Sequence, residues 1–135
     1  MTSGLEAALA DASSPSWAQR VRAGADLAVF ADVPEAAEAL AGLLLDVEDT
    51  VVTRRTAEAL VRVGKVAAVR LVALAVAEAD DNQADWLQTG MHDALVEPDG
   101  VPAVAAACEK LFRDQGEAVR RGAADISAWT DDARH

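Results

Sequence analysis

The chain has 135 residues, a formal net charge of −11 and 52% apolar residues, of which only five are aromatic. A chain of this length forms one domain that buries roughly two-thirds of its unfolded surface. With so few aromatic residues the core must be built from Ala, Val and Leu, which favours closely packed helices over a sheet. The excess of acidic residues disfavours binding to the phosphates of nucleic acids.

Three features of the sequence indicate the cellular compartment in which the protein is expected. A single cysteine, Cys108, cannot form an internal disulfide, which fits a reducing environment. The N-terminal stretch MTSGLEAALADASS has no basic segment followed by an apolar run, so we expect no signal peptide. The longest apolar run, residues 66–77, contains Arg70 and is too short to span a bilayer. We therefore expect a cytoplasmic protein with no membrane partner.

Residues 1–15 are expected to form an N-terminal segment or a capping helix, and residues 131–135 a polar tail. Between them, apolar residues spaced three and four apart predict a series of helices over residues 16–130. The first helices of successive pairs are expected near residues 16–30, 50–63, 83–96 and 117–129. The second helices are expected near residues 34–47, 66–79 and 101–115.

The helix pairs repeat. Residues 21–37 align with residues 54–70, and further partial copies follow at spacings of 35 and 31 residues. The dipeptide Val-Pro occurs at residues 33–34 and 101–102, where each hairpin would turn into its second helix, and proline is well tolerated at a helix start. We expect Gly64 to make the same corner in the middle unit. Asp32 and Asp99 are expected to cap the helices that follow them.

The middle second helix, VAAVRLVALAVAEA, is apolar almost all round and should be covered on several sides. The two ends of the chain are polar, as the outer units of a repeat stack must be. The pattern therefore predicts an all-α fold: a short α-solenoid of about three and a half antiparallel helix-hairpin repeats.

Residues 49–76, DTVVTRRTAEALVRVGKVAAVRLVALAV, resemble a HEAT-type repeat of the kind found in small bacterial HEAT-repeat proteins. The resemblance covers about residues 16–129 and is clearest in the paired arginines 54–55, in Ala59-Leu60 and in the glycine corner. The first unit has Val21-Arg22 and the third has Leu87-Gln88 where the paired arginines stand. The resemblance implies a gently curved solenoid of the kind used mostly to bind proteins.

No set of residues in the sequence suggests catalysis, a metal or a cofactor. His92 and His135 are the only histidines, and a zinc site of His92 and Cys108 would lack further ligands. Cys108 lies in an Ala-rich apolar stretch without a neighbouring base, which indicates a packed thiol rather than a nucleophile. The acidic stretch 78–85 lacks the glycine and glutamate of a calcium loop, so we expect an inter-repeat loop in which Asn82 or Asp85 caps the next helix.

Charge is unevenly distributed along the chain. Residues 1–49 carry nine acids and two bases, residues 50–77 carry one acid and five bases, and residues 78–100 carry seven acids and no base. One interpretation is that Arg54, Arg55 and Arg62 neutralise carboxylates of adjacent units, such as Asp26 or Asp93. The other is that the acidic regions attract a basic partner. Similarly, Trp17, Trp86 and Trp129 are expected to pack in the core or at caps, or else to anchor a partner.

The sequence thus predicts a non-enzymatic protein–protein interaction module, an adaptor or scaffold with an acidic surface. One alternative is an immunity or inhibitor protein that binds a basic toxin or enzyme. A second is a HEAT-like enzyme, since some such folds resemble DNA glycosylases or bilin lyases; the acidity argues against the former, and no candidate acid stands out for the latter. The binding surface is expected on the inner face of the second helices, at Glu35, Glu38, Arg70, Glu109, Lys110 and Arg113.

Overall fold

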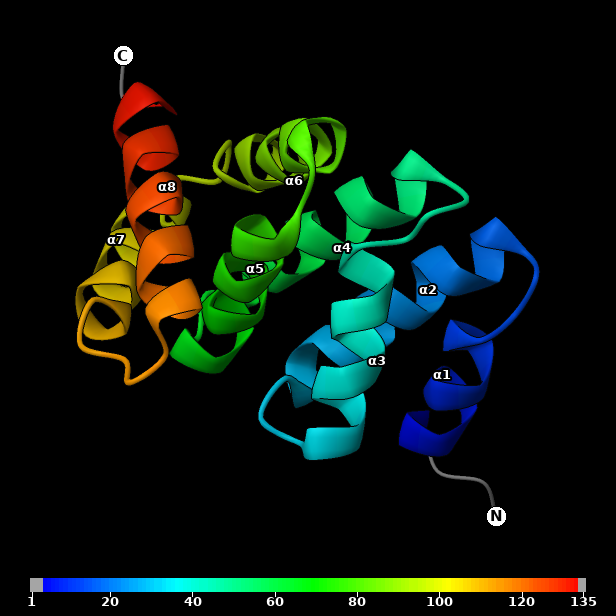
Figure 1. Ribbon diagram of the computed structural model, residues 1–135. Helices are drawn as coiled ribbons and strands as arrows, with labels where there is room; N and C mark the ends of the chain where they lie inside the picture. The colour runs from blue at the N-terminus through cyan, green and yellow to red at the C-terminus, as the bar shows by residue number, and fades with distance from the viewer. Residues whose placement is uncertain (1–3, 134–135) are drawn as a thin grey trace.

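The computed structural model describes residues 4–133, in which helices are joined by short loops (Figure 1). It contains eight α-helices and one short 3₁₀ helix, and no strand occurs in the described residues. The predicted all-α class is therefore confirmed. The helices are α1 (Gly4–Ala12), α2 (Trp17–Leu27), η1 (Ala28–Phe30), α3 (Pro34–Leu44), α4 (Thr50–Val63), α5 (Val66–Glu78), α6 (Asp81–Ala94), α7 (Gly100–Leu111) and α8 (Glu117–Ala133).

Helices α2, α4 and α6 each begin with a side chain that caps the backbone. Ser16 accepts a hydrogen bond from the Gln19 N–H, and Asp49 accepts one from the Val51 N–H. Asp80 and Gln83 form a reciprocal capping box at the start of α6. Because α6 begins directly after Asp80, the predicted caps Asn82 and Asp85 lie inside the helix, and that prediction was wrong.

Helices α3, α5 and α7 begin without a side-chain cap, after Val33, Lys65 and Asp99 respectively. The predicted cap Asp32 lies one residue too early, because Val33 occupies the capping position. Asp99 does occupy that position, but its backbone is helical (φ −88°, ψ −5°) instead of extended, and its side chain makes no capping bond. Both predictions were wrong.

The corner between α4 and α5 depends on Gly64. Its backbone is left-handed (φ 71°), and its N–H donates to the Leu60 carbonyl at 3.2 Å, which closes the last turn of α4. A residue with a Cβ would be strained in this conformation. The predicted glycine corner is therefore confirmed, and it reverses the chain without a proline.

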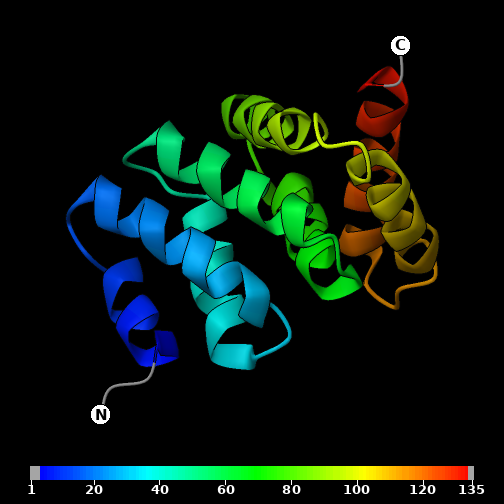
Figure 2. The same cartoon turned by 180° about the vertical axis from the view of Figure 1, so that it is seen from behind.

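The helices pack in two rows. In one row α4 lies between α2 and α6, and this row faces the viewer in Figure 2. On the other face α5 lies between α3 and α8, and α7 lies behind α8 in the view of Figure 1. Helix α1 packs against α2 and α3 at one end of the molecule. The rows are joined by contacts within each hairpin, such as those of α4 with α5.

Helix α8 does not lie where the repeat pattern predicts. As the first helix of a fourth unit it would extend the row of α2, α4 and α6, but it packs mainly on α5 and α7 and touches α6 only slightly (Figure 1). Helix α8 can approach α5 this closely because residue 122 is a glycine. A Cβ on Gly122 would lie 1.8 Å from the carbonyl oxygen of Ala73 in α5. Helix α8 also continues to Ala133, so residues 131–133 of the predicted tail are helical, and residues 134–135 lie outside the description.

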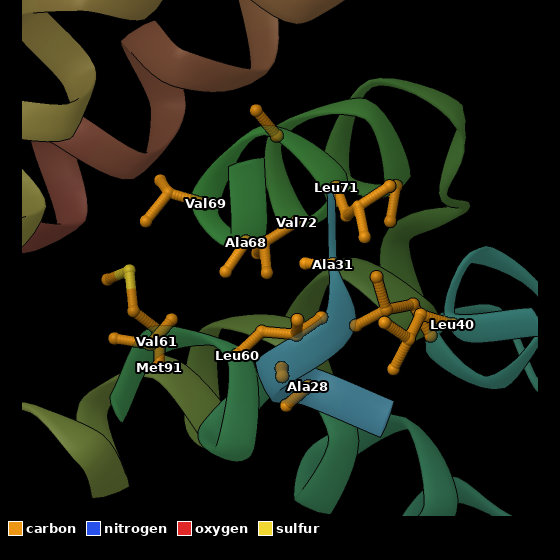
Figure 3. Packing of buried hydrophobic residues seen from close by; sticks show 14 of the residues in the cluster. Ala28, Ala31, Leu40, Leu60, Val61, Ala68, Val69, Leu71, Val72 and Met91 are labelled. Carbon is orange, nitrogen blue, oxygen red and sulfur yellow. The ribbon is translucent and has the colours of Figure 1, made fainter. Parts of the chain in front are cut away.

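The core is built from Ala, Val and Leu of all the long helices, with α5 at its centre. Figure 3 shows Val69 and Val72 of α5 close to Leu60 of α4, with Met91 of α6 beside them. Seven residues of α5 are buried because α3, α4, α6, α7 and α8 all contact it. This explains the nearly uniform apolar character of its sequence. Within residues 4–133, no helix combines the length and apolar character needed to cross a membrane.

Candidate functional site

Three loops lie side by side along one edge of the molecule. They precede the capped helices α2, α4 and α6, and they comprise residues 13–16, 45–49 and 79–80. Hollows lined by residues 12–15 together with 46–48, and by residues 46–50 together with 80–86, show that neighbouring loops approach each other. We call this surface the loop edge.

A buried ion pair holds the first two loops together. Arg20 of α2 is 7% exposed, and its Nε donates to Asp46 Oδ1 at 3.1 Å. Its Nη1 also donates to the Ser14 carbonyl at 2.9 Å, and Asp46 Oδ2 accepts from the Asp49 N–H at 2.7 Å. Because the arginine and the carboxylate satisfy each other and the adjacent backbone, the buried charge is compensated and the loops are fixed relative to α2.

A cavity of about 190 Å³ lies between the second and third loops. Its lining residues include four acidic residues and Trp86, and they include no lysine or arginine of the described chain. The buried Thr53 of α4 also lines it. The lining residues are Asp46, Val47, Glu48, Asp49, Thr50, Thr53, Asp80, Asn82, Gln83 and Trp86.

A second opening lies at the opposite edge, around the Gly64 corner. It has a volume of about 440 Å³ and a mainly apolar floor that includes Val61, Ala94 and Ala103. Charged groups surround it: Lys65 and Asp99, and an ion pair of Arg62 with Glu97 at 3.2 Å. Both signs of charge are therefore present at this opening, in contrast to the cavity of the loop edge.

The basic band of residues 50–77 is largely neutralised by carboxylates. Arg54 Nε donates to Asp93 Oδ2 of the next unit at 2.7 Å, and this hydrogen bond raises the pKa of Arg54. Arg62 binds Glu58 at 2.9 Å as well as Glu97. The prediction that these arginines pair with carboxylates of adjacent units is confirmed for Asp93, whereas Asp26 pairs with none of them in the described part of the chain.

The six predicted binding residues are all exposed on the second helices or just after them. Glu35 and Glu38 lie on α3, Arg70 lies on α5, and the others lie on α7 and in the turn that follows it: Glu109, Lys110 and Arg113. Helix α5 separates α3 from α7, and α8 lies across α5 and α7. Arg70 is held by Asp114 at 3.0 Å. The surface formed by these residues is therefore interrupted by α8, and their role in binding remains a prediction.

The cysteine, the histidine of α6 and the tryptophans of α2 and α8, which the sequence analysis considered as possible site residues, lie as follows. Cys108 is 1% exposed, and burial, with a smaller contribution from Glu109, raises the pKa of its thiol to about 11. His92 Nε2 lies 3.3 Å from the Trp129 carbonyl oxygen, while His135 lies outside the described residues. Trp129 packs against the core, but Trp17 is exposed at the start of α2. Among the described residues, no three His, Cys, Asp or Glu side chains are grouped so that they could hold a metal ion.

The sequence interpretation missed Arg20 and Asp46. A signal was present, because Arg20, Ala23, Gly24 and Leu27 share one face of α2, and the last three are small or apolar. An arginine on such a face is buried and requires a carboxylate partner. The partner itself, 26 residues further on, could not be identified without the fold.

Comparison with known proteins gives no relative for this chain: no family model, no curated protein and no solved structure matches it.

Proposed function

We propose that the chain is a non-catalytic protein-interaction module, an adaptor or scaffold, that binds a basic segment of another protein along the loop edge. One observation carries the proposal: four acidic residues and no lysine or arginine of the described chain line the cavity of the loop edge, and Arg20 behind the wall compensates only part of their charge. A concave surface with one sign of charge concentrates its field and attracts ligands of the opposite sign. Such complementarity raises the rate of association and selects the partner.

We also propose that α2 to α7 act as a short HEAT-like solenoid of three helical hairpins, with α1 and α8 as its ends. The two rows of helices and the tight corner at Gly64 support this proposal. A repeat stack offers a broad and rigid surface instead of a deep pocket, which suits protein binding. The resemblance of residues 49–76 to a HEAT-type repeat points in the same direction.

The test is an affinity capture with the whole chain on a resin, at low salt, followed by elution with a salt gradient. The matched control is a resin that carries an unrelated acidic protein at the same charge density. We expect a basic protein that elutes later from the first resin than from the control, because specific binding adds to general charge attraction. Equal elution from both resins for every basic protein would refute the proposal.

The captured partner also decides between an adaptor and an inhibitor. If the partner is an enzyme or toxin, its activity is measured with the purified chain added at increasing concentrations. Complete loss of activity at a one-to-one ratio would identify an inhibitor, whereas unchanged activity would identify an adaptor.

A further inference from the structure

We infer that the edge opposite the loop edge is a second binding surface, a groove for one amphipathic helix of a partner protein. This surface, which we call the corner edge, comprises residues 28–32, 63–65 and 94–100, where α2, α4 and α6 turn into α3, α5 and α7. Helices α2, α4 and α6 lie side by side (Figure 2), so the three corners follow one another in chain order. The inference goes beyond the proposed function, because it assigns a different surface and a different class of partner.

Two openings lie between the three corners. The larger one, of about 440 Å³, lies between the Gly64 corner and the corner of α6 with α7, and its floor is mainly apolar. The smaller one, of about 100 Å³, lies between the Gly64 corner and the corner of α2 with α3, and alanine and valine make up most of its lining. Val63 and Lys65 line both openings. The two openings therefore adjoin each other along the corner edge.

Apolar side chains are also exposed at the outer two corners. Val29 of η1 lines the smaller opening and is 59% exposed, and Phe30 beside it is 36% exposed. Val96, in the corner between α6 and α7, is 82% exposed. A single exposed apolar residue is ordinary, but several of them beside apolar openings are typical of a surface that a partner covers.

The spacing of the openings favours a helical partner. Helices packed in a row lie about 8–10 Å apart. Each opening lies between one pair of neighbouring corners, so the openings are separated by roughly the same interval. An α-helix rises about 10 Å in seven residues, and residues seven apart share one face. A helix laid along the corner edge therefore places one apolar side chain in each opening, which is the usual way in which a groove binds a helix.

The charges of the corner edge specify the polar residues of that helix. Lys65 lies between the openings, Asp32 lines the smaller one and Asp99 lines the larger one. The side chains of these three residues make no ion pair or hydrogen bond within residues 4–133, whereas Arg62 and Glu97 pair with each other. The unpaired charges thus alternate along the edge as acid, base and acid. A complementary helix carries an acidic residue between its two apolar anchors and a basic residue outside each of them.

The probe is a synthetic alanine-rich peptide of about 18 residues, which is long enough to form a helix. It carries a leucine and a valine about seven residues apart, a glutamate halfway between them and a lysine outside each. The control peptide has the same composition, with the leucine and the valine on opposite faces. Fluorescence anisotropy measures binding at about 150 mM salt, where general charge attraction is screened. We expect the first peptide to bind at least about tenfold more tightly than the control; equal binding of the two would overturn the inference.

Two alanine positions of α7 locate the groove. Ala103→Leu fills the larger opening, because Ala103 is half-buried in its lining. Ala106→Leu makes the same change at an exposed position that lines neither opening. We expect the first variant to weaken the peptide at least about tenfold and the second less than about twofold. If Ala103→Leu fails to fold, Ala67→Leu, which fills the smaller opening, takes its place. An equal loss in the filled and the control variant would refute the groove.

A charge exchange tests the central contact. The glutamate peptide is compared with a second peptide that has lysine at the central position. We expect the preference for the glutamate peptide to fall about tenfold in Lys65→Glu. The fall should be less than about twofold in Arg121→Glu, which changes the net charge equally at an exposed position of α8. The same fall in both variants would mean that only net charge matters, and it would overturn the inference.

The outcomes for the two edges are separate. None of these peptides or variants involves the residues of the loop edge. Failure of the helix peptide therefore refutes the groove and leaves the proposed binding of a basic segment standing. Failure of the affinity capture on the acidic edge refutes the proposed function and leaves the groove to be judged by the peptides alone.

Discussion

The carbonyl oxygen of Ala73 determines how closely α8 can approach α5. A Cβ on Gly122 would lie 1.8 Å from that oxygen, and a Cβ on Gly90 would lie 2.2 Å from the carbonyl oxygen of Arg54 at the crossing of α4 and α6. At these two crossings the backbones themselves are in contact. This is the expected consequence of a core with few large side chains, where helices must approach closely to fill space.

Alanine substitutions of Gly122 and Gly42 should therefore change the free energy of unfolding in opposite directions. Gly122→Ala forces α8 away from α5, and we expect it to lower the free energy of unfolding by about 3 kcal/mol or more. Gly42 lies in α3, and no neighbouring atom stands within 4 Å of the point that its Cβ would occupy, so Gly42→Ala should raise that free energy by about 0.4–1 kcal/mol. Urea unfolding followed by circular dichroism measures both, and similar values for the two variants would contradict the close crossing.

The buried thiol of Cys108 should be almost unreactive in the folded protein. Its pKa of about 11 leaves little thiolate near pH 8, and its burial blocks access to reagents. We expect a disulfide reagent to label it at least about a hundredfold more slowly in buffer than in denaturant. Fast labelling of the folded chain would show that α7 opens readily.

At the scale of single elements, the structure links distant parts of the chain by ion pairs at helix ends. Arg70 of α5 binds Asp114, which lies in the turn between α7 and α8. The hydrogen bond from Arg70, together with one from the Gly116 N–H, lowers the pKa of Asp114. Asp114 therefore ties the turn to α5 in its charged form.

The contribution of Asp114 to stability should depend on pH. Since its folded pKa is depressed, the contribution is present above its ordinary pKa and is lost as the pH falls through the folded value. We expect Asp114→Asn to lower the free energy of unfolding at pH 7 by no more than about 1 kcal/mol, because Arg70 is partly exposed. The difference from wild type should vanish in unfolding curves measured well below pH 4; a difference that persists there would have another cause.

Helix positions could be predicted from the sequence far better than helix caps. The expected second helix 66–79 and the observed α5 differ by one residue, because periodicity and the glycine corner are local signals. The predictions of capping residues failed because capping depends on the exact position and on the backbone angles of one residue. Asp32 precedes the capping position of α3, and Asp99 occupies that of α7 with helical instead of extended angles. The pattern of Asp80 followed by Gln83 is a capping box that the sequence did contain.

At the scale of the whole molecule, the arrangement of α8 and the cavity of the loop edge could not be predicted. Both depend on contacts between residues far apart in sequence, such as Gly122 with Ala73 and the loop of Asp49 with that of Asp80. The uneven charge could be read from the sequence, but its concentration in one cavity could not. The binding face predicted on the second helices also took no account of α8, which lies across α5 and α7.

The net charge of −11 should make stability depend on salt. Acidic residues exceed basic ones, so like-charge repulsion opposes the compact state and is screened as salt rises. We expect the free energy of unfolding to increase between about 10 mM and 150 mM sodium chloride. The increase should be smaller in the double variant Asp26→Asn with Asp125→Asn. A decrease would mean that ion pairs such as Arg54 with Asp93 outweigh the repulsion.

The position of α8 over α5 has a consequence for synthesis of the chain on the ribosome. Helix α5 is complete at Glu78, but one of its covering helices spans Glu117–Ala133. At about 5–20 residues per second, residues 79–133 take roughly 3–11 s to be added. During that interval part of the most apolar helix stays uncovered on the nascent chain. The acidic residues that precede it, nine against two bases in residues 1–49, would then keep neighbouring nascent chains apart by repulsion.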